Sequence, residues 1–258
     1  MRILITNDDG LGSHGLTHLE AELAADAEVW AVAPDRERSA TSQAITVFQT
    51  MRLIRAGERH FRLTGFPADC VNVALFSDLF PKFDLVISGI NHGVNLGDDI
   101  HYSGTVGAAR HAALHGYRAL AVSTPMPDKH GDFHRPARWL REWLGEYLEF
   151  LEPTVVYNIN YPGETDARPN DPLPDFRITR QGRRRYNDEY EIVEEGQGDD
   201  GHYRLLKLRD NPMGHAHMAD GDFVALEAGL VAVCPLTTDT THAPEIERWT
   251  TNRHSANS

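Results

Sequence analysis

Residues 1–10 read MRILITNDDG, and this stretch contains both the first structural element and the first candidate site of the chain. The apolar run at residues 3–5 is typical of a buried strand. It leads directly into two adjacent carboxylates, Asp8 and Asp9. Neighbouring carboxylates repel each other where an interior strand emerges, so the pattern indicates a cation between them.

The first half of the chain alternates between strand and helix patterns. Short apolar runs predict strands, and segments with apolar residues at helical spacing predict helices. The predicted strands are 2–6, 28–33, 83–88, 119–123 and 154–159, and the predicted helices are 16–25, 105–115 and 135–150. This alternation predicts an α/β fold with a mostly parallel sheet and helices on both of its faces.

The second half has a different pattern. Predicted strands at 177–179, 190–193 and 203–208 are separated by polar, Gly-rich turns, which indicates a β-hairpin extension. Residues 230–234 predict a strand that returns to the body, and the polar last nine residues are expected to be exposed or in a subunit contact. We therefore expect one domain over residues 1–258, with a core of about 1–165 and an arm, return strand and tail at about 175–258.

Composition excludes several classes of function. The net charge of -13 argues against binding of a nucleic-acid polymer, because the phosphate backbone would be repelled. No apolar run is long enough to span a membrane, so we expect neither a signal peptide nor a membrane contact. Cys70 and Cys234 both lie in apolar surroundings, which favours two reduced core thiols and a cytoplasmic location.

Three polar segments follow predicted strands and are expected to meet at one edge of the sheet. They begin at Asn7, at Pro34 and at Ser88. Together they offer the oxygen donors that Mg²⁺ and Mn²⁺ prefer, namely two adjacent carboxylates, a hydroxyl and an amide oxygen. The candidate ligands are Asp8, Asp9, Ser39 and Asn91. The alternative for the carboxylates is a helix N-cap, although a cap needs only one of them.

The segment YSGTVGAA at residues 102–109 predicts a phosphate-binding helix start. Small residues that open a helix present unpaired backbone N–H groups, and Ser103 and Thr105 add hydroxyl groups. The same pattern also describes ordinary helix capping, so the phosphate hypothesis depends on the neighbouring metal site.

Other charged groups leave alternatives open. Arg36 and Arg38 either attract an anionic substrate or offset the carboxylates. The run of arginines at 183–185 is expected to form a solvated face or a subunit contact. Close histidine pairs such as His111 and His115 lack the partner residues of a zinc motif.

Four segments together resemble the SurE family (survival protein E) of metal-dependent nucleotidases. They are NDDG at 7–10, APDRERS at 33–39, GFPADCV at 65–71 and SGINHGVNLGDDIHYSGTV at 88–106. Two departures are Phe66 in place of the commoner Thr and the order Thr241-His242-Ala243, which does not carry over a role for His242.

The resemblance implies a Rossmann-like sheet with a C-terminal hairpin and tail that form a homodimer or homotetramer. It also implies one Mg²⁺ or Mn²⁺ per subunit, held by the four candidate ligands above. The residues that it places around the phosphate are Asn95, Ser103, Gly104 and Thr105.

The expected activity is hydrolysis of nucleoside monophosphates, at the 5′ and possibly the 3′ position, with Asp8 and Asp9 as catalytic residues. Other small phosphate esters or short polyphosphate are alternative substrates. A haloacid-dehalogenase-type phosphatase would need an Asp-x-Asp pair, and here the carboxylates are adjacent. A receiver-like signalling module would need an Asp at the end of its third strand, where this chain has Ser88-Gly89.

Overall fold

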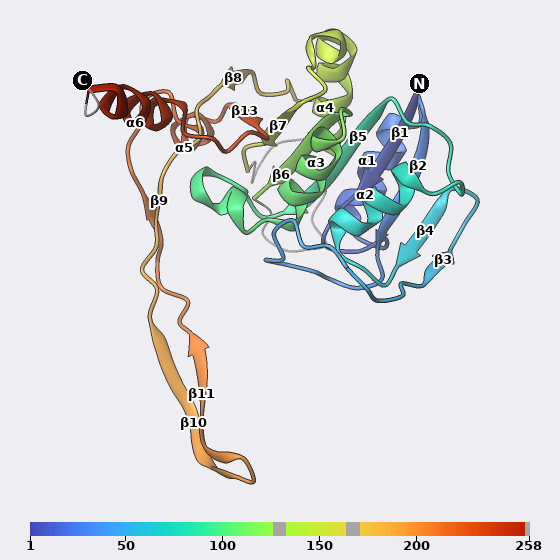
Figure 1. The fold of residues 1–258 in the computed structure, drawn as a ribbon. Helices are drawn as coiled ribbons and strands as arrows, with labels where there is room; N and C mark the ends of the chain where they lie inside the picture. The colour runs from blue at the N-terminus through green and yellow to red at the C-terminus, as the bar shows by residue number, and fades with distance from the viewer. Residues whose placement is uncertain (126–132, 164–170, 256–258) are drawn as a thin grey trace.

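The computed structural model describes residues 1–125, 133–163 and 171–255, and it is built around one nine-stranded sheet (Figure 1). The strand order is β3-β4-β2-β1-β5-β6-β7-β13-β8. The strands of this sheet are β1 (Arg2–Thr6), β2 (Glu28–Pro34), β3 (Leu53–Arg55), β4 (His60–Leu63), β5 (Leu85–His92), β6 (Arg118–Thr124), β7 (Val155–Asn160), β8 (Phe176–Ile178) and β13 (Val231–Thr237).

Most neighbouring strands of this sheet run parallel, which confirms the predicted fold class. The exceptions are the antiparallel pairs β3–β4 and β7–β13. The predicted strand at 83–88 is corrected to Leu85–His92, because β5 continues past a register irregularity between Ser88 and Asn91. Asn91 therefore lies in the strand and not in the loop after it.

Helices cover both faces of the sheet because successive strand side chains point to opposite sides. On one face, α1 (His14–Leu23) and α4 (His134–Tyr147) bury a core that includes Ile3 and Ile5. On the other face, α2 (Pro67–Phe76) and α3 (Gly104–Leu114) bury a second core that includes Leu4. Short 3₁₀ turns lie at Gly97–His101 and Leu148–Phe150.

The C-terminal part forms a hairpin arm that projects from the body (Figure 1). Its strands are β10 (Tyr190–Gly198) and β11 (Gly201–Leu208), which pair with each other antiparallel. At the base of the arm, β9 (Arg184–Arg185) pairs with β12 (Gly214–His215), and we call residues 182–186 and 214–215 the arm root. The chain then passes through α5 (Asp222–Glu227) and returns to the sheet in β13.

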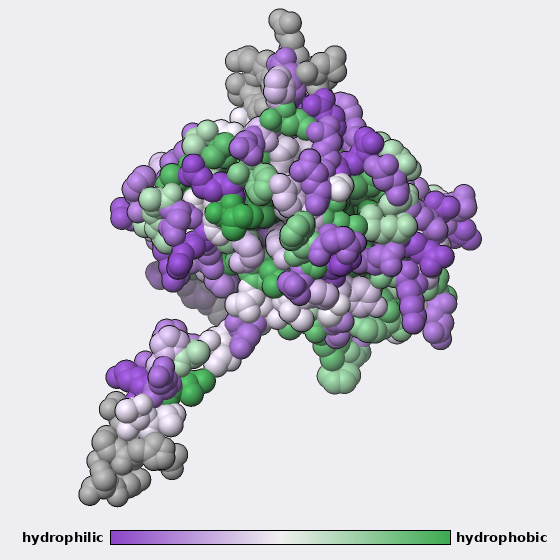
Figure 2. Space-filling model, turned by 90° about the horizontal axis from the view of Figure 1, so that it is seen from above, coloured by the Kyte–Doolittle hydropathy of each residue, from purple (hydrophilic) through white to green (hydrophobic). Residues whose placement is uncertain are grey.

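The tail contains a helix that was not expected from the sequence, since α6 spans Ala243–Ser255. Ile246 and Trp249 on this helix are exposed. Figure 2 shows the C-terminal segment standing away from the body, with hydrophobic residues between hydrophilic ones. The apolar residues of α6 lie among many polar ones, so the sequence pattern does not reveal the helix.

Within the described residues, no helix is both long enough and apolar enough to cross a membrane.

Candidate active site

The candidate site lies where the order of the strands reverses along the chain. From β1 the chain moves to β2 on one side and later to β5 on the other, so the carboxyl ends of these three strands border a crevice. Ligands bind at such switch points in open α/β sheets. A recess of ≈ 390 Å³ lies there, and six of the eight predicted site residues line it: Asp8, Asp9, Ser39, Asn91, Asn95 and Ser103.

A tight turn carries the two carboxylates from β1 into the recess. The Asn7 side chain is fully buried and closes this turn on Gly10. Its Oδ1 accepts from the Gly10 N–H at 3.0 Å, and its Nδ2 donates to the Gly10 carbonyl oxygen at 3.1 Å. Gly10 has φ of +99°, a conformation that glycine adopts without strain. The turn therefore fixes the backbone on both sides of the carboxylate pair.

Asp8 is a buried carboxylate whose charge is poorly compensated. Its side chain is only 6% exposed, and burial raises the pKa of Asp8 from 3.8 to about 6. The Thr105 hydroxyl donates to Asp8 Oδ1 at 2.7 Å and lowers the pKa, whereas the nearby Asp9 carboxylate raises it. A cation at this position would remove the energetic cost of the charged form.

Ser39 and Asn91 both present oxygen lone pairs toward the recess. The Ser39 hydroxyl donates its proton to Glu37 Oε1 at 2.9 Å, so the lone pairs of Oγ remain for another partner. The Asn91 amide donates from Nδ2 to the Gly93 carbonyl oxygen at 2.8 Å, which leaves Oδ1 as its remaining polar atom. Both orientations suit a metal ligand.

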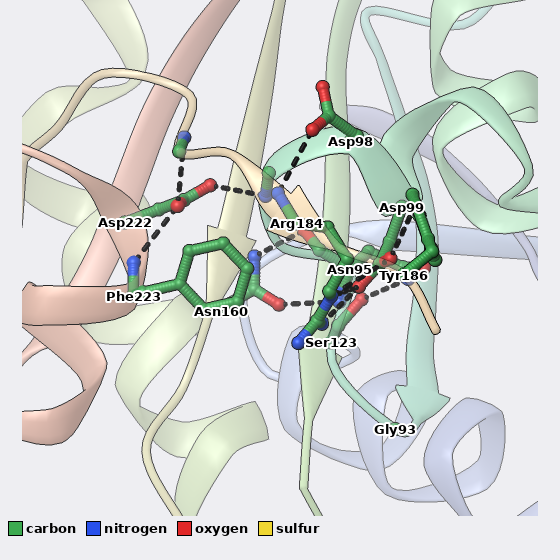
Figure 3. A network of polar contacts seen from close by, with 12 residues as sticks. Gly93, Asn95, Asp98, Asp99, Ser123, Asn160, Arg184, Tyr186, Asp222 and Phe223 are labelled. Atoms are coloured by element: carbon green, nitrogen blue, oxygen red, sulfur yellow. Dashed lines mark hydrogen bonds and ion pairs between the residues drawn. The ribbon is translucent and has the colours of Figure 1, made fainter. Parts of the chain in front are cut away.

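Asn95 is held by the sheet from three sides (Figure 3). Its backbone N–H donates to Asn160 Oδ1 at 2.8 Å, and its Nδ2 donates to Ser123 Oγ at 2.7 Å. Its carbonyl oxygen accepts from Asn158 at 2.8 Å and from Asn160 at 3.0 Å. The Oδ1 atom is the group that this cradle leaves for a ligand.

The start of α3 is shaped to approach both Asp8 and a ligand. Ser103 is the N-cap, and its Oγ accepts from the Val106 N–H at 3.1 Å. The N–H groups of Gly104 and Thr105 belong to the first helical turn, where no intrahelical acceptor exists. The structure places the fully buried Thr105 side chain against Asp8, so of Thr105 only the backbone N–H can serve a phosphate.

The donor set fits a hard divalent cation. The recess offers two carboxylates, a hydroxyl and an amide oxygen, which are the ligand types of Mg²⁺ and Mn²⁺. In the described part of the chain, no group of three or more His, Cys, Asp or Glu residues could hold a metal. A softer, thiolate-rich or imidazole-rich metal centre is therefore absent from these residues.

A second recess, of ≈ 300 Å³, adjoins the first. The two share Asp9, Glu37 and His92 in their linings. The second recess is bordered by the loop between β1 and α1, by the segment after β2, by Arg62 of β4 and by Phe133 before α4. Arg36 lines this recess, whereas Arg38 lies 3.7 Å from Asp35 and over the Phe66 ring.

The arm root contacts a residue that lines the first recess, which the sequence did not reveal. Arg184 is 12% exposed and forms an ion pair with Asp99, a residue that lines the recess (Figure 3). Its guanidinium carbon also lies 4.6 Å from the centre of the Phe223 ring. The expected solvated face is wrong for Arg184, although Arg183 beside it is 71% exposed, and the alternative of a subunit contact stays a prediction. Three adjacent arginines carry no signal that distinguishes the partly buried one from its exposed neighbours.

Buried Asp222 is a second residue that the sequence did not indicate. It accepts from the backbone N–H groups of Gly97 at 2.8 Å, Gly182 at 3.0 Å and Phe223 at 2.9 Å. Desolvation raises the pKa of Asp222, and the three hydrogen bonds oppose this effect. It joins the arm root to the loop that leads toward α3.

Three comparisons with known proteins all point to the same family. A family model described as Survival protein SurE matches residues 3–188. The 5'-nucleotidase SurE of Leptospira biflexa is 40% identical over 253 residues, which cover 98% of this chain and 100% of the relative. The 5'-nucleotidase SurE of Leptospira interrogans is 42% identical over 241 residues, or 93% of each chain. The crystal structure of the SurE protein from Aquifex aeolicus has a TM-score of 0.78 at 28% identity, over 96% of this chain and 98% of that one.

Proposed function

The chain belongs to the SurE family of survival proteins, and from this premise we propose that it is a phosphoric monoester hydrolase that cleaves nucleoside monophosphates. The observation that carries the proposal is the recess at the strand switch point, where carboxylates and the open start of a helix face one space. Carboxylates there suit a cation, and free N–H groups suit a phosphate.

We propose Asp8, Asp9, Ser39 and Asn91 as the ligands of one divalent cation, Mg²⁺ or Mn²⁺. A bound divalent cation polarises phosphate oxygens and lowers the pKa of water. The burial of Asp8 and the orientation of the Asn91 amide support this ligand set.

The residues of the chain itself would supply binding, orientation and proton transfer. The N–H groups of Gly104 and Thr105 and the hydroxyl of Ser103 would donate to the phosphate oxygens, where negative charge is concentrated in the transition state. Asn95 would add its side chain to the same group of contacts. Asp8 or Asp9 would orient the attacking water and accept its proton.

We also propose that the protein acts as a homodimer or homotetramer in the cytoplasm. The arm carries many apolar side chains that are exposed in the single chain: Tyr190, Ile192, Val193, Tyr203, Leu205, Leu206 and Leu208. Exposed apolar surface of this extent favours burial against another chain, and a second copy suits an arm that projects from the body. The two cysteines are free and buried, which suits a reducing compartment.

The test is phosphate release from nucleoside monophosphates with Mn²⁺, by the unaltered protein and by Asp8→Asn and Asp9→Asn variants. Each substitution removes one carboxylate charge from the proposed site, so we expect Mn²⁺-stimulated turnover to fall by at least about 100-fold. Asp78→Asn is a matched control, because Asp78 is an exposed aspartate outside both recesses. Undiminished turnover in both site variants would contradict the assignment.

A further inference from the structure

The second recess is lined largely by residues that the chemistry of phosphate transfer does not require. It continues from the proposed metal site, because Asp9, Glu37 and His92 belong to both linings. A phosphate bound in the first recess would therefore direct its ester oxygen and leaving group either into this space or into solvent. A volume of ≈ 300 Å³ falls within the range of small-ligand sites.

Two arginines line this recess without an ion-pair partner in the described part of the chain. Arg62 lies on β4, where the alternation of side chains places it opposite Phe61 and Leu63, which face the core on the side of α2. It therefore points to the side of α1, where the recess lies. Arg36 reaches the same space from the segment after β2. Each guanidinium offers several N–H donors that suit oxygen and ring-nitrogen acceptors.

The remaining lining is partly apolar and aromatic. Leu11 and Phe133 supply hydrocarbon surface, and His14 and His92 supply rings. His92 Nε2 is buried and has no hydrogen-bond partner among the described residues. A flat ring system with polar edges matches this mixture of apolar walls and convergent donors.

The charges decide between two ligands, a nucleoside and a second phosphate. The lining contains the cations Arg36 and Arg62 and the carboxylates Asp9, Asp35 and Glu37. A second phosphate would meet three carboxylates, and the repulsion would offset its attraction to the arginines. A neutral nucleoside has hydroxyl and amino donors for the carboxylates and ring acceptors for the arginines.

We propose that this recess binds the nucleoside of the substrate, with Arg62 and Arg36 as specificity-determining residues that donate to acceptors on the base. This assignment rests on the proposed function. The phosphate would occupy the first recess beside Asp9, and the nucleoside would extend past Glu37 and His92 into the second.

The test compares two substrates in the full-length protein with saturating Mn²⁺. One is a set of nucleoside monophosphates, with nucleoside 3′,5′-bisphosphates assayed beside them, and the other is glycerol phosphate, which has a similar ester but no base. In Arg62→Ala, we expect the ratio of kcat/KM for nucleotides to that for glycerol phosphate to fall about tenfold, mainly through KM, and inhibition by a free nucleoside to weaken similarly. Arg36→Ala should change the ratio in the same direction.

Arg59→Ala is the matched control. Arg59 is a partly exposed arginine close to Arg62 in sequence, lies outside the recess and is 3.9 Å from Glu28. Arg59→Ala removes the same charge as Arg62→Ala but no side chain of the recess, so we expect no change in the ratio. A ratio that changes equally in Arg59→Ala would show a general charge effect and overturn the assignment.

Four further results would also overturn it. Equal losses on nucleotides and glycerol phosphate would place Arg62 on the phosphate. A loss confined to nucleoside 3′,5′-bisphosphates would assign the recess to a second phosphate. If the unaltered protein hydrolyses nucleotides but the ratio is unchanged in both arginine variants, the assignment of the recess to the nucleoside fails and the proposed function stands. If the unaltered protein releases no phosphate from nucleotides, the proposed function fails and this assignment fails with it.

Discussion

At the scale of single residues, the candidate site depends on how closely the start of α3 approaches Asp8. Residue 104 must be small for this approach. A Cβ atom added to Gly104 would lie 3.0 Å from Asp8 Cβ and 3.1 Å from its Oδ2 atom. The glycine thus allows the N–H groups of the helix and the carboxylate to face the same space.

We therefore expect Gly104→Ala to displace Asp8 and to lower Mn²⁺-stimulated turnover by at least about tenfold. Stability should change little, because alanine favours the helix by up to about 1 kcal/mol and offsets part of the steric strain. Steady-state kinetics and thermal denaturation measure the two effects. Gly145→Ala is the control, since a Cβ on that α4 glycine would meet no atom within 4 Å. Full activity in Gly104→Ala would contradict the role of this contact.

At the scale of elements, the loop at residues 95–103 is fixed from two directions (Figure 3). The sheet holds Asn95 through the side chains of β6 and β7. On the other side, Asp222 accepts from Gly97, and the Arg184 backbone N–H donates to Asp98 Oδ2 at 2.9 Å. The segment that precedes α3 therefore joins the sheet to the arm root.

Asp222→Asn tests this connection. The amide replaces one acceptor oxygen by a donor that faces backbone N–H groups, so at least one of them loses its partner. We expect the free energy of unfolding to fall by about 2 kcal/mol in urea denaturation and the KM for nucleotides to rise. Asp220→Asn is the control. The side chains of Asp220 and its ion-pair partner Arg180 are 64% and 78% exposed, so we expect this substitution to change stability by less than about 0.5 kcal/mol. Equal effects of the two substitutions would contradict a specific role for Asp222.

At the scale of the whole molecule, the burial of Asp8 couples stability to pH. Asp8 has a pKa of about 6 in the folded, metal-free protein against 3.8 for the free side chain. Because the folded-state pKa is raised, its contribution to stability is present below about pH 4 and is lost as the pH rises through 6. A shift of about two pKa units corresponds to about 3 kcal/mol.

A bound cation should reverse this loss, since it stabilises the charged carboxylate. At about 100 times its Kd, Mn²⁺ should stabilise the fold by about 2.7 kcal/mol. We expect the melting temperature to rise by about 5 °C or more at pH 7.5 and much less at pH 5, where protons compete with the metal.

Differential scanning fluorimetry with and without Mn²⁺ at both pH values measures the effect. Asp8→Asn should melt higher than the unaltered protein at pH 7.5 without metal and should respond weakly to Mn²⁺. Equal metal-induced shifts at the two pH values would contradict the coupling.

Much of the fold could be predicted from local patterns. The alternation of short apolar runs with helical segments indicated the parallel sheet, and the predicted strands agree with β1, β2, β6 and β7 within one residue or so at their ends. The helix α6 was missed because its apolar residues lie among many polar ones. The short strands β3 and β4 at one side of the sheet were also missed, since three or four residues show too little periodicity.

The sequence by itself determined which oxygen donors lie at the ends of which strands, because hydrophobic periodicity and turn chemistry act over a few residues. Only the tertiary structure decided their partners. Thr105 donates to Asp8 across 97 positions of the chain, Asp222 reaches Gly97 across 125, and Arg184 is partly buried while Arg183 is exposed. Such contacts depend on how helices and strands pack in three dimensions, and no local pattern of residues encodes that packing.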